Sequence, residues 1–248
     1  MDYLALFAHP DAFARPDIWA SLLTLTALEI VLGVDNLVFV ALATQGLPPD
    51  RALKASRLGL GMAVVFRLAL LAGMVWMIHL TTPILSIMDR PVSARDLILV
   101  CGGLFLLYKG TLEIHEEIDP EIEDGGRKSG KGFWRAIFQI AVLDIVFSLD
   151  SVLTAIGMAD DFAVMAAAVV VAVGLMILAA GPVGQFIREN PTVKMLALAF
   201  LLLIGVTLIA DGAGHDIPKG FVYSAVGFSL LVEGLNQWAR RRRAARRG

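Results

Sequence analysis

Two pairs of acidic residues stand inside long apolar stretches of this sequence, where carboxylates are rare. Glu29 and Asp35 lie in the run LEIVLGVDN, and Asp144 and Asp150 lie in the run LDIVFSLDS. A carboxylate at the centre of a membrane helix costs roughly 2.5–3.5 kcal/mol. The four residues must therefore face a hydrated or paired interior, where they could bind a cation or carry protons.

Two other interpretations of these acids are also open. Some of the carboxyl groups could be protonated and hydrogen-bonded to neighbouring helices, which would make their role structural. Two aspartates that share a proton could also form an intramembrane protease site, but the G-x-G-D signature of such enzymes is absent, because Gly33-Val34-Asp35 lacks the first glycine. We therefore expect no enzymatic activity.

Helix geometry indicates which polar residues share a face with the first acid of each pair. At about 100° per residue, positions seven apart lie on one face of a helix. Glu29 therefore shares a face with Asn36, and Asp144 shares a face with Ser151. An amide and a hydroxyl are thus expected beside the two carboxylates.

The second acid of each pair needs a further assumption to reach the same place. Asp35 and Asp150 lie about 120° away from their partners in an uninterrupted helix. A local break at Gly33 in the first run and at Ser148 in the second would turn all four acids into one cavity, as the broken helices of transporters do. A continuous helix with a wide polar face is the alternative.

The six side chains expected at the site are carboxylates, an amide and a hydroxyl, so each of them would bind a metal ion through oxygen. They are Glu29, Asp35, Asn36, Asp144, Asp150 and Ser151. Such oxygens suit hard or borderline divalent cations such as Mn²⁺, Mg²⁺ or Ca²⁺, whereas Cu⁺ and Zn²⁺ prefer sulfur or imidazole. The pattern predicts a site for a transported divalent cation and no permanently bound cofactor.

The composition of the chain agrees with a membrane location for these residues. Of its 248 residues, 57% are apolar and 18% are charged, and the mean hydropathy is +0.74. Soluble domains have about 25% charged residues, so a soluble enzyme is excluded. Seven apolar stretches are long enough to cross a hydrocarbon layer of about 30 Å as helices. They cover residues 19–43, 58–79, 96–112, 136–157, 162–182, 193–211 and 220–238.

The two acidic runs mark an internal repeat. Residues 19–112 and 136–211 form two three-helix halves, and because three spans separate the two runs, the halves have inverted topology. Residues 113–135 are expected to form a charged cytoplasmic loop, and residues 212–238 a seventh helix outside the repeat. The predicted fold is an all-α integral membrane protein with seven transmembrane helices, made of two inverted three-helix repeats and a seventh helix.

The distribution of basic residues predicts the orientation in the membrane. With seven spans, fifteen Lys and Arg residues fall on the side of the C-terminus and four on the side of the N-terminus. Because basic loops remain cytoplasmic, residues 1–18 are expected to be external and residues 239–248 to form a basic cytoplasmic tail. We expect this tail to anchor the topology beside anionic lipid rather than to bind nucleic acid. The predicted location is the bacterial inner (plasma) membrane.

Other polar residues could serve in charge balance or along a pathway. Arg67 must be paired or solvated in the second helix, either as a counter-cation that occupies the empty site or as a static ion pair with the acids. Possible pathway residues are Ser148, Asp211, Glu233 and Asn236, of which the last three could equally be interfacial caps. The acidic segment 113–124 could gather cations, but a solvated run of charges is the simpler interpretation.

Three runs of the sequence carry a likeness to a known family. They are WASLLTLTALEIVLGVDNLVFVAL, AVLDIVFSLDSVLTAIGM and IADGAGHDIPKGFVYSAVGFSLLVEGLN. The sequence in these runs resembles the TerC family of integral membrane proteins, named after tellurium resistance and grouped with the LysE-type transporters, and the likeness extends over roughly residues 17–238. Several members are regarded as manganese exporters. The resemblance implies that Glu29, Asp35, Asp144 and Asp150 are metal ligands, with the amide and hydroxyl that follow them in sequence close by.

These features predict a membrane transporter that exports a divalent cation, with Mn²⁺ as the expected substrate, by alternating access in which one half rocks against the other. The phosphate-binding pattern G-x-x-x-x-G-K-[ST] is absent from the sequence, so an ion gradient would supply the energy. Protons are the expected coupling ion, since four carboxylates can exchange them for a dication. The alternative is a non-transporting membrane factor that assists metal loading or assembly of other proteins. The other expected partner is the lipid bilayer.

Overall fold

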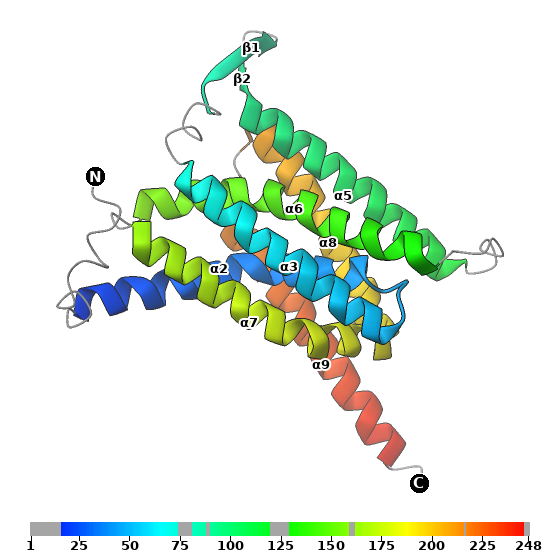
Figure 1. Cartoon of the computed structure of the whole chain (residues 1–248). Coiled ribbons are helices and arrows are strands. Elements are labelled where there is room, and N and C mark those ends of the chain that lie inside the picture. Colours follow the sequence, from blue (N-terminus) through cyan, green and yellow to red (C-terminus); the bar gives the residue numbers. More distant parts are fainter. Residues whose placement is uncertain are drawn as a thin grey trace. The chain divides into compact units, whose positions relative to one another are not determined.

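The computed structural model describes residues 16–73, 81–87, 90–119, 129–158, 162–215 and 217–245. Within these ranges the chain forms seven long α-helices and one small two-stranded sheet, which Figure 1 labels, so the predicted all-α class is confirmed. The helices are α2 (Pro16–Ala43), α3 (Pro49–Ala72), α5 (Ala94–Ile118), α6 (Ser129–Met158), α7 (Phe162–Glu189), α8 (Pro191–Gly212) and α9 (Lys219–Ala245).

The helix ends follow the local chemistry of proline and glycine. Pro49 and Pro191 are the first residues of α3 and α8, where a missing backbone N–H costs nothing because that group has no partner within the helix. After the end of α8, Gly214 adopts a φ of 73°, and the N–H of His215 donates to the carbonyl of Ala210. This arrangement satisfies carbonyl groups that the last turn of a helix leaves open.

Several helices extend beyond the apolar stretches that predict them. α3 begins at Pro49 rather than at residue 58, and α5 continues to Ile118. Residues 113–118 and 129–135 are therefore helical, although their charged composition predicts a loop. The physical reason is that hydropathy marks only the lipid-facing part of a helix, whereas backbone hydrogen bonds continue into its polar ends.

A two-stranded antiparallel sheet follows α3 in sequence, and the hydropathy pattern does not predict it. Its strands are β1 (Pro83–Ile87) and β2 (Arg90–Ser93). Leu85 is paired with Val92 and Ile87 with Arg90, with an irregularity near the start of β1. Strands this short are difficult to recognise, because alternation over four or five residues carries little information.

The helices that carry the acids are continuous. α2 runs without interruption through Gly33, and α6 runs without interruption through Ser148. The hypothesis of a local break is therefore wrong, and the uninterrupted alternative is right. A side-chain Cβ on Gly33 would lie only 2.7 Å from Sδ of Met176 on α7. The glycine thus allows close packing between α2 and α7 and does not mark an unwound segment.

Five helices are long and apolar enough to cross a membrane. They are α2, α3, α5, α7 and α8. These five belong to the part of the chain that the structure describes, in which the side chains of α6 are included only up to Ser148. The count of seven spans and the inverted topology of the repeat therefore remain predictions.

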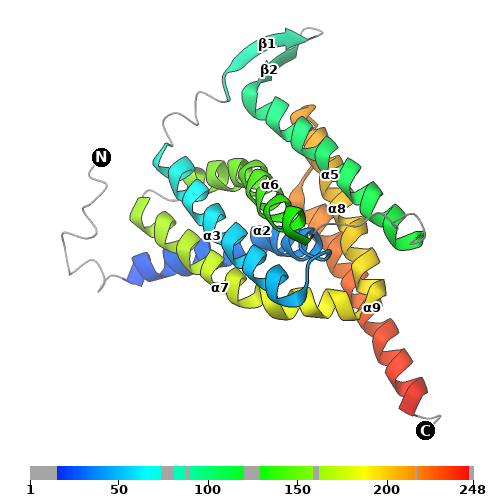
Figure 2. The ribbon, with the colours of Figure 1, turned by 45° about the vertical axis from the view of Figure 1, so that its right-hand side comes forward.

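The chain divides into two compact units, each built from helices that are distant in sequence. Unit 1 contains α2, α3, α6, nearly all of α7 and the hairpin, and unit 2 contains nearly all of α5 together with α8 and α9. Within unit 1, α3 lies against α6 (Figure 2). A Cβ on Gly59 of α3 would come within 2.8 Å of Ile140 on α6, so the small residue permits this close approach.

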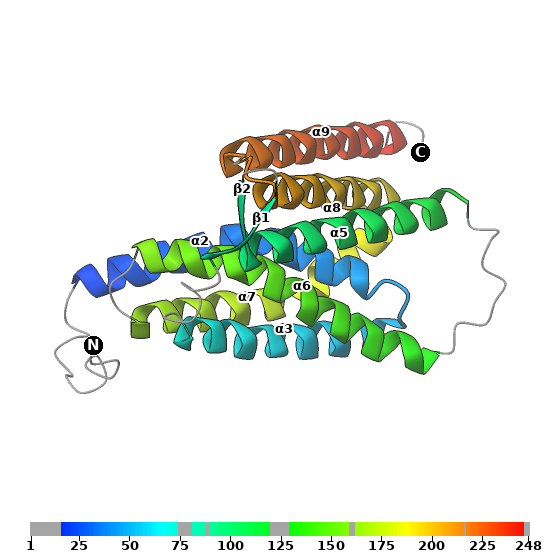
Figure 3. The ribbon, with the colours of Figure 1, turned by 90° about the horizontal axis from the view of Figure 1, so that it is seen from above.

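Unit 2 is also built on close contact between helix backbones. A Cβ on Gly103 of α5 would lie 2.5 Å from the carbonyl oxygen of Gly205 on α8, and one on Gly212 would lie 2.6 Å from the carbonyl oxygen of Asp96. Small residues at such crossings let membrane helices pack through backbone contacts. α9 runs alongside α8 in the same unit (Figure 3).

Candidate functional site

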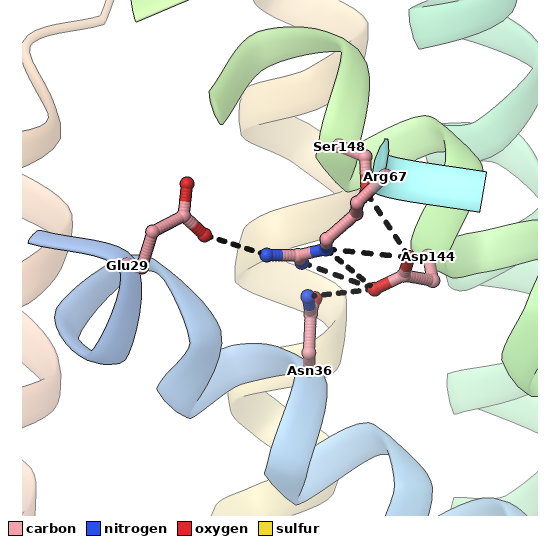
Figure 4. A network of polar contacts seen from close by, with 5 residues as sticks. All are labelled: Glu29, Asn36, Arg67, Asp144 and Ser148. Carbon is pink, nitrogen blue, oxygen red and sulfur yellow. Dashed lines mark hydrogen bonds and ion pairs between the residues drawn. The ribbon is translucent and has the colours of Figure 1, made fainter. Parts of the chain in front are cut away.

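A network of five buried polar side chains lies inside unit 1 (Figure 4). Glu29 and Asn36 come from α2, Arg67 comes from α3, and Asp144 and Ser148 come from α6. Each of these residues is 5% exposed or less. Polar groups this deeply buried are stable only when they are hydrogen-bonded or paired, so their contacts define the chemistry of the site.

Arg67 joins the two acids. Its Nη1 donates to Oε2 of Glu29 at 2.7 Å, and its Nη2 donates to Oδ1 of Asp144 at 3.0 Å. Its Nε lies 3.3 and 3.4 Å from the two carboxylate oxygens of Asp144. One guanidinium therefore holds the first acid of each predicted repeat, and it holds Asp144 by two neighbouring nitrogens, the geometry that suits arginine and a carboxylate best.

Two neutral side chains complete the surroundings of Asp144. Ser148, one turn further along α6, donates its hydroxyl to Oδ2 at 3.0 Å, and Asn36 donates its Nδ2 to Oδ1 at 3.3 Å. Because the amide nitrogen of Asn36 points at a carboxylate, its Oδ1 points elsewhere. Within the part of the chain that the structure describes, this buried oxygen has no hydrogen-bond partner.

The helical spacing predicted from the sequence is confirmed for α2. Glu29 contacts Arg67, and Asn36, seven residues later, contacts Asp144, to which Arg67 is paired. Asp35 is only partly buried and is not one of the five residues joined in Figure 4. A continuous helix explains this difference, since it places Asp35 on another face.

The predictions for the second half of the site have mixed outcomes. Asp144 is at the centre of the network, and the hydroxyl beside it belongs to Ser148. Asp150 and Ser151 lie within α6, but their side chains are outside the part of the chain that the structure describes. The contact between Asp144 and Ser148 could have been expected from sequence, because residues four apart are neighbours on a helix.

The remaining pathway residues lie in unit 2 and make other contacts. Asp211 accepts a hydrogen bond from the backbone N–H of Ile217 at 3.3 Å, as a residue at a helix end would. Glu233 accepts from Thr192 at 2.5 Å and from Gln237 at 3.3 Å. Asn236 is exposed. None of these residues makes the contacts drawn in Figure 4.

The first part of the acidic segment is engaged in ion pairs. Glu113 pairs with Lys109 one turn before it on α5, at 2.9 Å, and Glu117 pairs with Lys194 of α8. Lys109 therefore has a local partner, which explains how its side chain can be largely buried. Among the described residues of this segment, the charges at positions 113 and 117 stabilise unit 2.

The network can offer oxygen donors to a hard cation. Glu29 and Asp144 supply carboxylates, and Asn36 supplies an amide oxygen that is free of other contacts among the described residues. Divalent cations such as Mn²⁺, Mg²⁺ and Ca²⁺ bind such oxygens. Among the side chains that the structure describes, however, no group of three or more His, Cys, Asp and Glu residues is close enough to hold a metal ion. The two acids instead share the guanidinium of Arg67.

The chain combines long apolar helices with a buried network of ion pairs. These two features are typical of an integral membrane protein with a polar site in its interior. The comparison with known families agrees with that class. The chain belongs to the TerC family, since the family described as "Integral membrane protein TerC family" matches residues 14–247.

Relatives of this chain occur in Escherichia coli (strain K12). The chain is 51% identical over 227 residues to the UPF0053 inner membrane protein YoaE, and 48% identical over 227 residues to the UPF0053 protein YegH. These matches cover 91% of this chain but only 44% and 43% of YoaE and YegH. The UPF0053 inner membrane protein YgdQ is 51% identical over 221 residues, which cover 89% of this chain and 93% of YgdQ. No protein of solved structure matches.

Proposed function

We propose that this protein exports a divalent cation across the bacterial plasma membrane, with Mn²⁺ as the substrate, in exchange for protons. The observation that carries the proposal is the meeting of Glu29 and Asp144 in one buried network. The two acids occupy the same position in two corresponding sequence runs. A structural ion pair requires a single acid and a single base, whereas two acids around one base leave negative charge available to a cation.

The donor set supports a hard cation as the substrate. The side chains that contact the two acids in Figure 4 do so through nitrogen or oxygen atoms, and the buried Oδ1 of Asn36 lies in the same network without a donor among the described residues. An unpaired buried amide oxygen costs free energy. A bound dication would remove that cost, because Mn²⁺ accepts amide and carboxylate oxygens together.

The division into units supports an inverted repeat as the basis of transport. Unit 1 contains the first two helices of each predicted half, α2 with α3 and α6 with α7, and unit 2 contains the third helix of each half, α5 and α8. Equivalent helices of two related halves are expected to take equivalent places. Transporters built from such repeats bind their substrate near the middle of the membrane and expose it to each side in turn.

A flux assay with purified protein tests the proposal. The protein would be reconstituted into liposomes, and the entry of Mn²⁺ would be followed with a trapped fluorescent indicator. We expect saturable Mn²⁺ flux that Glu29→Gln and Asp144→Asn abolish, whereas Glu233→Gln, an acid of unit 2, retains it. Specific Mn²⁺ binding without any flux would refute transport and favour the non-transporting metal-loading factor.

A further inference from the structure

Arg67 occupies the space between the two acids that a substrate cation would have to enter. Its side chain is 2% exposed, and it is among the largest fully buried side chains of the described chain. Its three nitrogens contact Oε2 of Glu29 and both carboxylate oxygens of Asp144. The guanidinium is thus a cation bound by the same oxygens that would bind a metal.

We propose that Arg67 is a tethered cation that fills the site when no metal is bound, and that the divalent cation must displace it. This inference rests on the function proposed above and adds a determinant of its affinity. Arginine keeps its positive charge at any pH that proteins tolerate, so the empty site always holds a cation. The substrate therefore competes with a residue of the protein itself.

The geometry at Asp144 indicates that a bound metal ion would displace Arg67 from the carboxylate and would not share the carboxylate with it. Both carboxylate oxygens of Asp144 accept hydrogen bonds from Arg67. Divalent cations bind oxygen at about 2.0–2.6 Å, closer than the nitrogens of Arg67, which lie 3.0 Å or more from Asp144. A metal on this carboxylate would repel the guanidinium in a buried region where charges are poorly screened. The arginine must then move away from Asp144.

The amide of Asn36 indicates that the arginine does not satisfy the site completely. Asn36 is 4% exposed and is held in place by its hydrogen bond to Asp144. Its Oδ1 has no partner among the described residues, although Arg67 contacts the same aspartate. A dication bound to the two carboxylates could engage this oxygen as well once the amide turns over and points Oδ1 toward Asp144. The site therefore has one more ligand atom for a metal than Arg67 uses.

Competition from a tethered group explains how the site could both bind and release its substrate. Since α3 holds Arg67 beside the acids, the effective concentration of the competing charge is high. The arginine then weakens metal binding to a level from which the metal can leave. A transporter needs this property, because a cation held by two buried carboxylates without a competitor would dissociate slowly.

The test is the affinity of purified protein for Mn²⁺, measured by titration calorimetry at about pH 8 to limit competition by protons. We expect Arg67→Gln to bind Mn²⁺ at least about tenfold more tightly than the unchanged protein, because opposite charges this close are coupled by at least that factor. Arg67→Lys, which keeps the charge but loses the planar set of donors, should lie between them. Arg57→Gln, an exposed arginine on the same helix, is the matched control and should not change the affinity.

Loss of Arg67 could also prevent folding, and a second measurement covers that case. If Arg67→Gln is recovered only when Mn²⁺ is present, and Mn²⁺ raises its melting temperature more than that of the unchanged protein, the proposal is supported. If Mn²⁺ does not rescue Arg67→Gln, the affinity of Arg67→Lys decides: tighter binding supports the proposal and weaker or equal binding overturns it. Weaker or equal binding by folded Arg67→Gln also overturns it and leaves Arg67 a structural ion pair. If the unchanged protein binds no divalent cation, the proposed function itself fails, and this inference fails with it.

Discussion

The substitution Asp144→Asn tests the central contact of the network without any assumption about transport. Asp144 accepts hydrogen bonds from Arg67, Asn36 and Ser148, and it is buried. An asparagine at this position loses the negative charge and turns an amide group toward at least one donor. Breaking a buried charge pair costs about 3–5 kcal/mol, because the remaining charge is left without compensation.

The contacts of the other acids give a ranking of expected effects. Glu29 has one strong contact with Arg67, at 2.7 Å, and hydrogen bonds to charged groups contribute about 1.5–3 kcal/mol. Glu233 is only partly buried, so water can replace the two hydrogen bonds that it accepts from neutral side chains, and the loss of its charge leaves no buried partner charge uncompensated. We therefore expect the loss of stability to be largest for Asp144→Asn, smaller for Glu29→Gln and smallest for Glu233→Gln.

The assay is the free energy of unfolding of each purified variant in detergent micelles, obtained from reversible denaturant titration. A double-mutant cycle between Asp144→Asn and Arg67→Gln isolates the pair, and we expect a coupling free energy of about 1.5 kcal/mol or more. A coupling near zero, or a cost for Asp144→Asn no larger than that for Glu233→Gln, would show that the two charges do not depend on each other. The network in Figure 4 would then be the wrong description of the site.

Three further predictions concern topology, the second acid of each pair and helix packing. A reporter fused to the C-terminus should be cytoplasmic and one fused near the N-terminus external, as fifteen basic residues against four imply; equal location of both ends would exclude an odd number of spans. Asp35→Asn should reduce the tolerance of cells to excess Mn²⁺ less than Glu29→Gln does, because the continuous α2 places Asp35 on another face, and Asp150→Asn, at the corresponding position of α6, should behave in the same way; a loss of tolerance as complete as that of Glu29→Gln would return these acids to the site. Gly103→Ala should cost about 1–3 kcal/mol in detergent unfolding, because its Cβ would lie 2.5 Å from a backbone oxygen, whereas Gly227→Ala, where a Cβ meets nothing within 4 Å, should be neutral or slightly stabilising.

Local helix geometry accounts for the part of the site that could be predicted from sequence. Glu29 and Asn36 share a face because the helical period is the same in any uninterrupted helix, and both lie in the network. Arg67 could be assigned to the acids because a buried charge in an apolar helix requires a partner. Lys109, which also lies within a predicted helix, has Glu113 one turn away.

Tertiary packing accounts for the part that could not be predicted. A glycine within a helix, such as Gly33, is typical of a helix break, but here it allows Met176 to approach α2. Such a contact between distant segments leaves no local pattern in the sequence. The apolar stretches give wrong ends for α3 and α5, because hydropathy does not distinguish a polar helical turn from a loop. The paired strands β1 and β2 are too short to give a clear alternation.

The coupling of metal movement to protons is the prediction that most directly concerns mechanism. A carboxylate must be ionised to bind a metal, so Mn²⁺ affinity should rise with pH, and binding should release protons. Two acids surround Arg67 in the network, and a single guanidinium neutralises only one of them. The excess negative charge of the empty site can therefore be balanced by a proton, which a dication would expel.

The measurement uses proteoliposomes that contain indicators of both Mn²⁺ and pH. An imposed proton gradient should drive Mn²⁺ against its own concentration gradient, and Mn²⁺ flux should move protons in the opposite direction. Asp144→Asn should abolish both movements, since the variant lacks a carboxylate that both cations need, and Glu233→Gln should retain both. If Mn²⁺ binding is constant between about pH 5.5 and pH 8, or if Mn²⁺ crosses without any counter-movement of protons, exchange is excluded. Saturable flux without protons would then make the protein a uniporter, whose empty site keeps the negative charge that Arg67 does not neutralise.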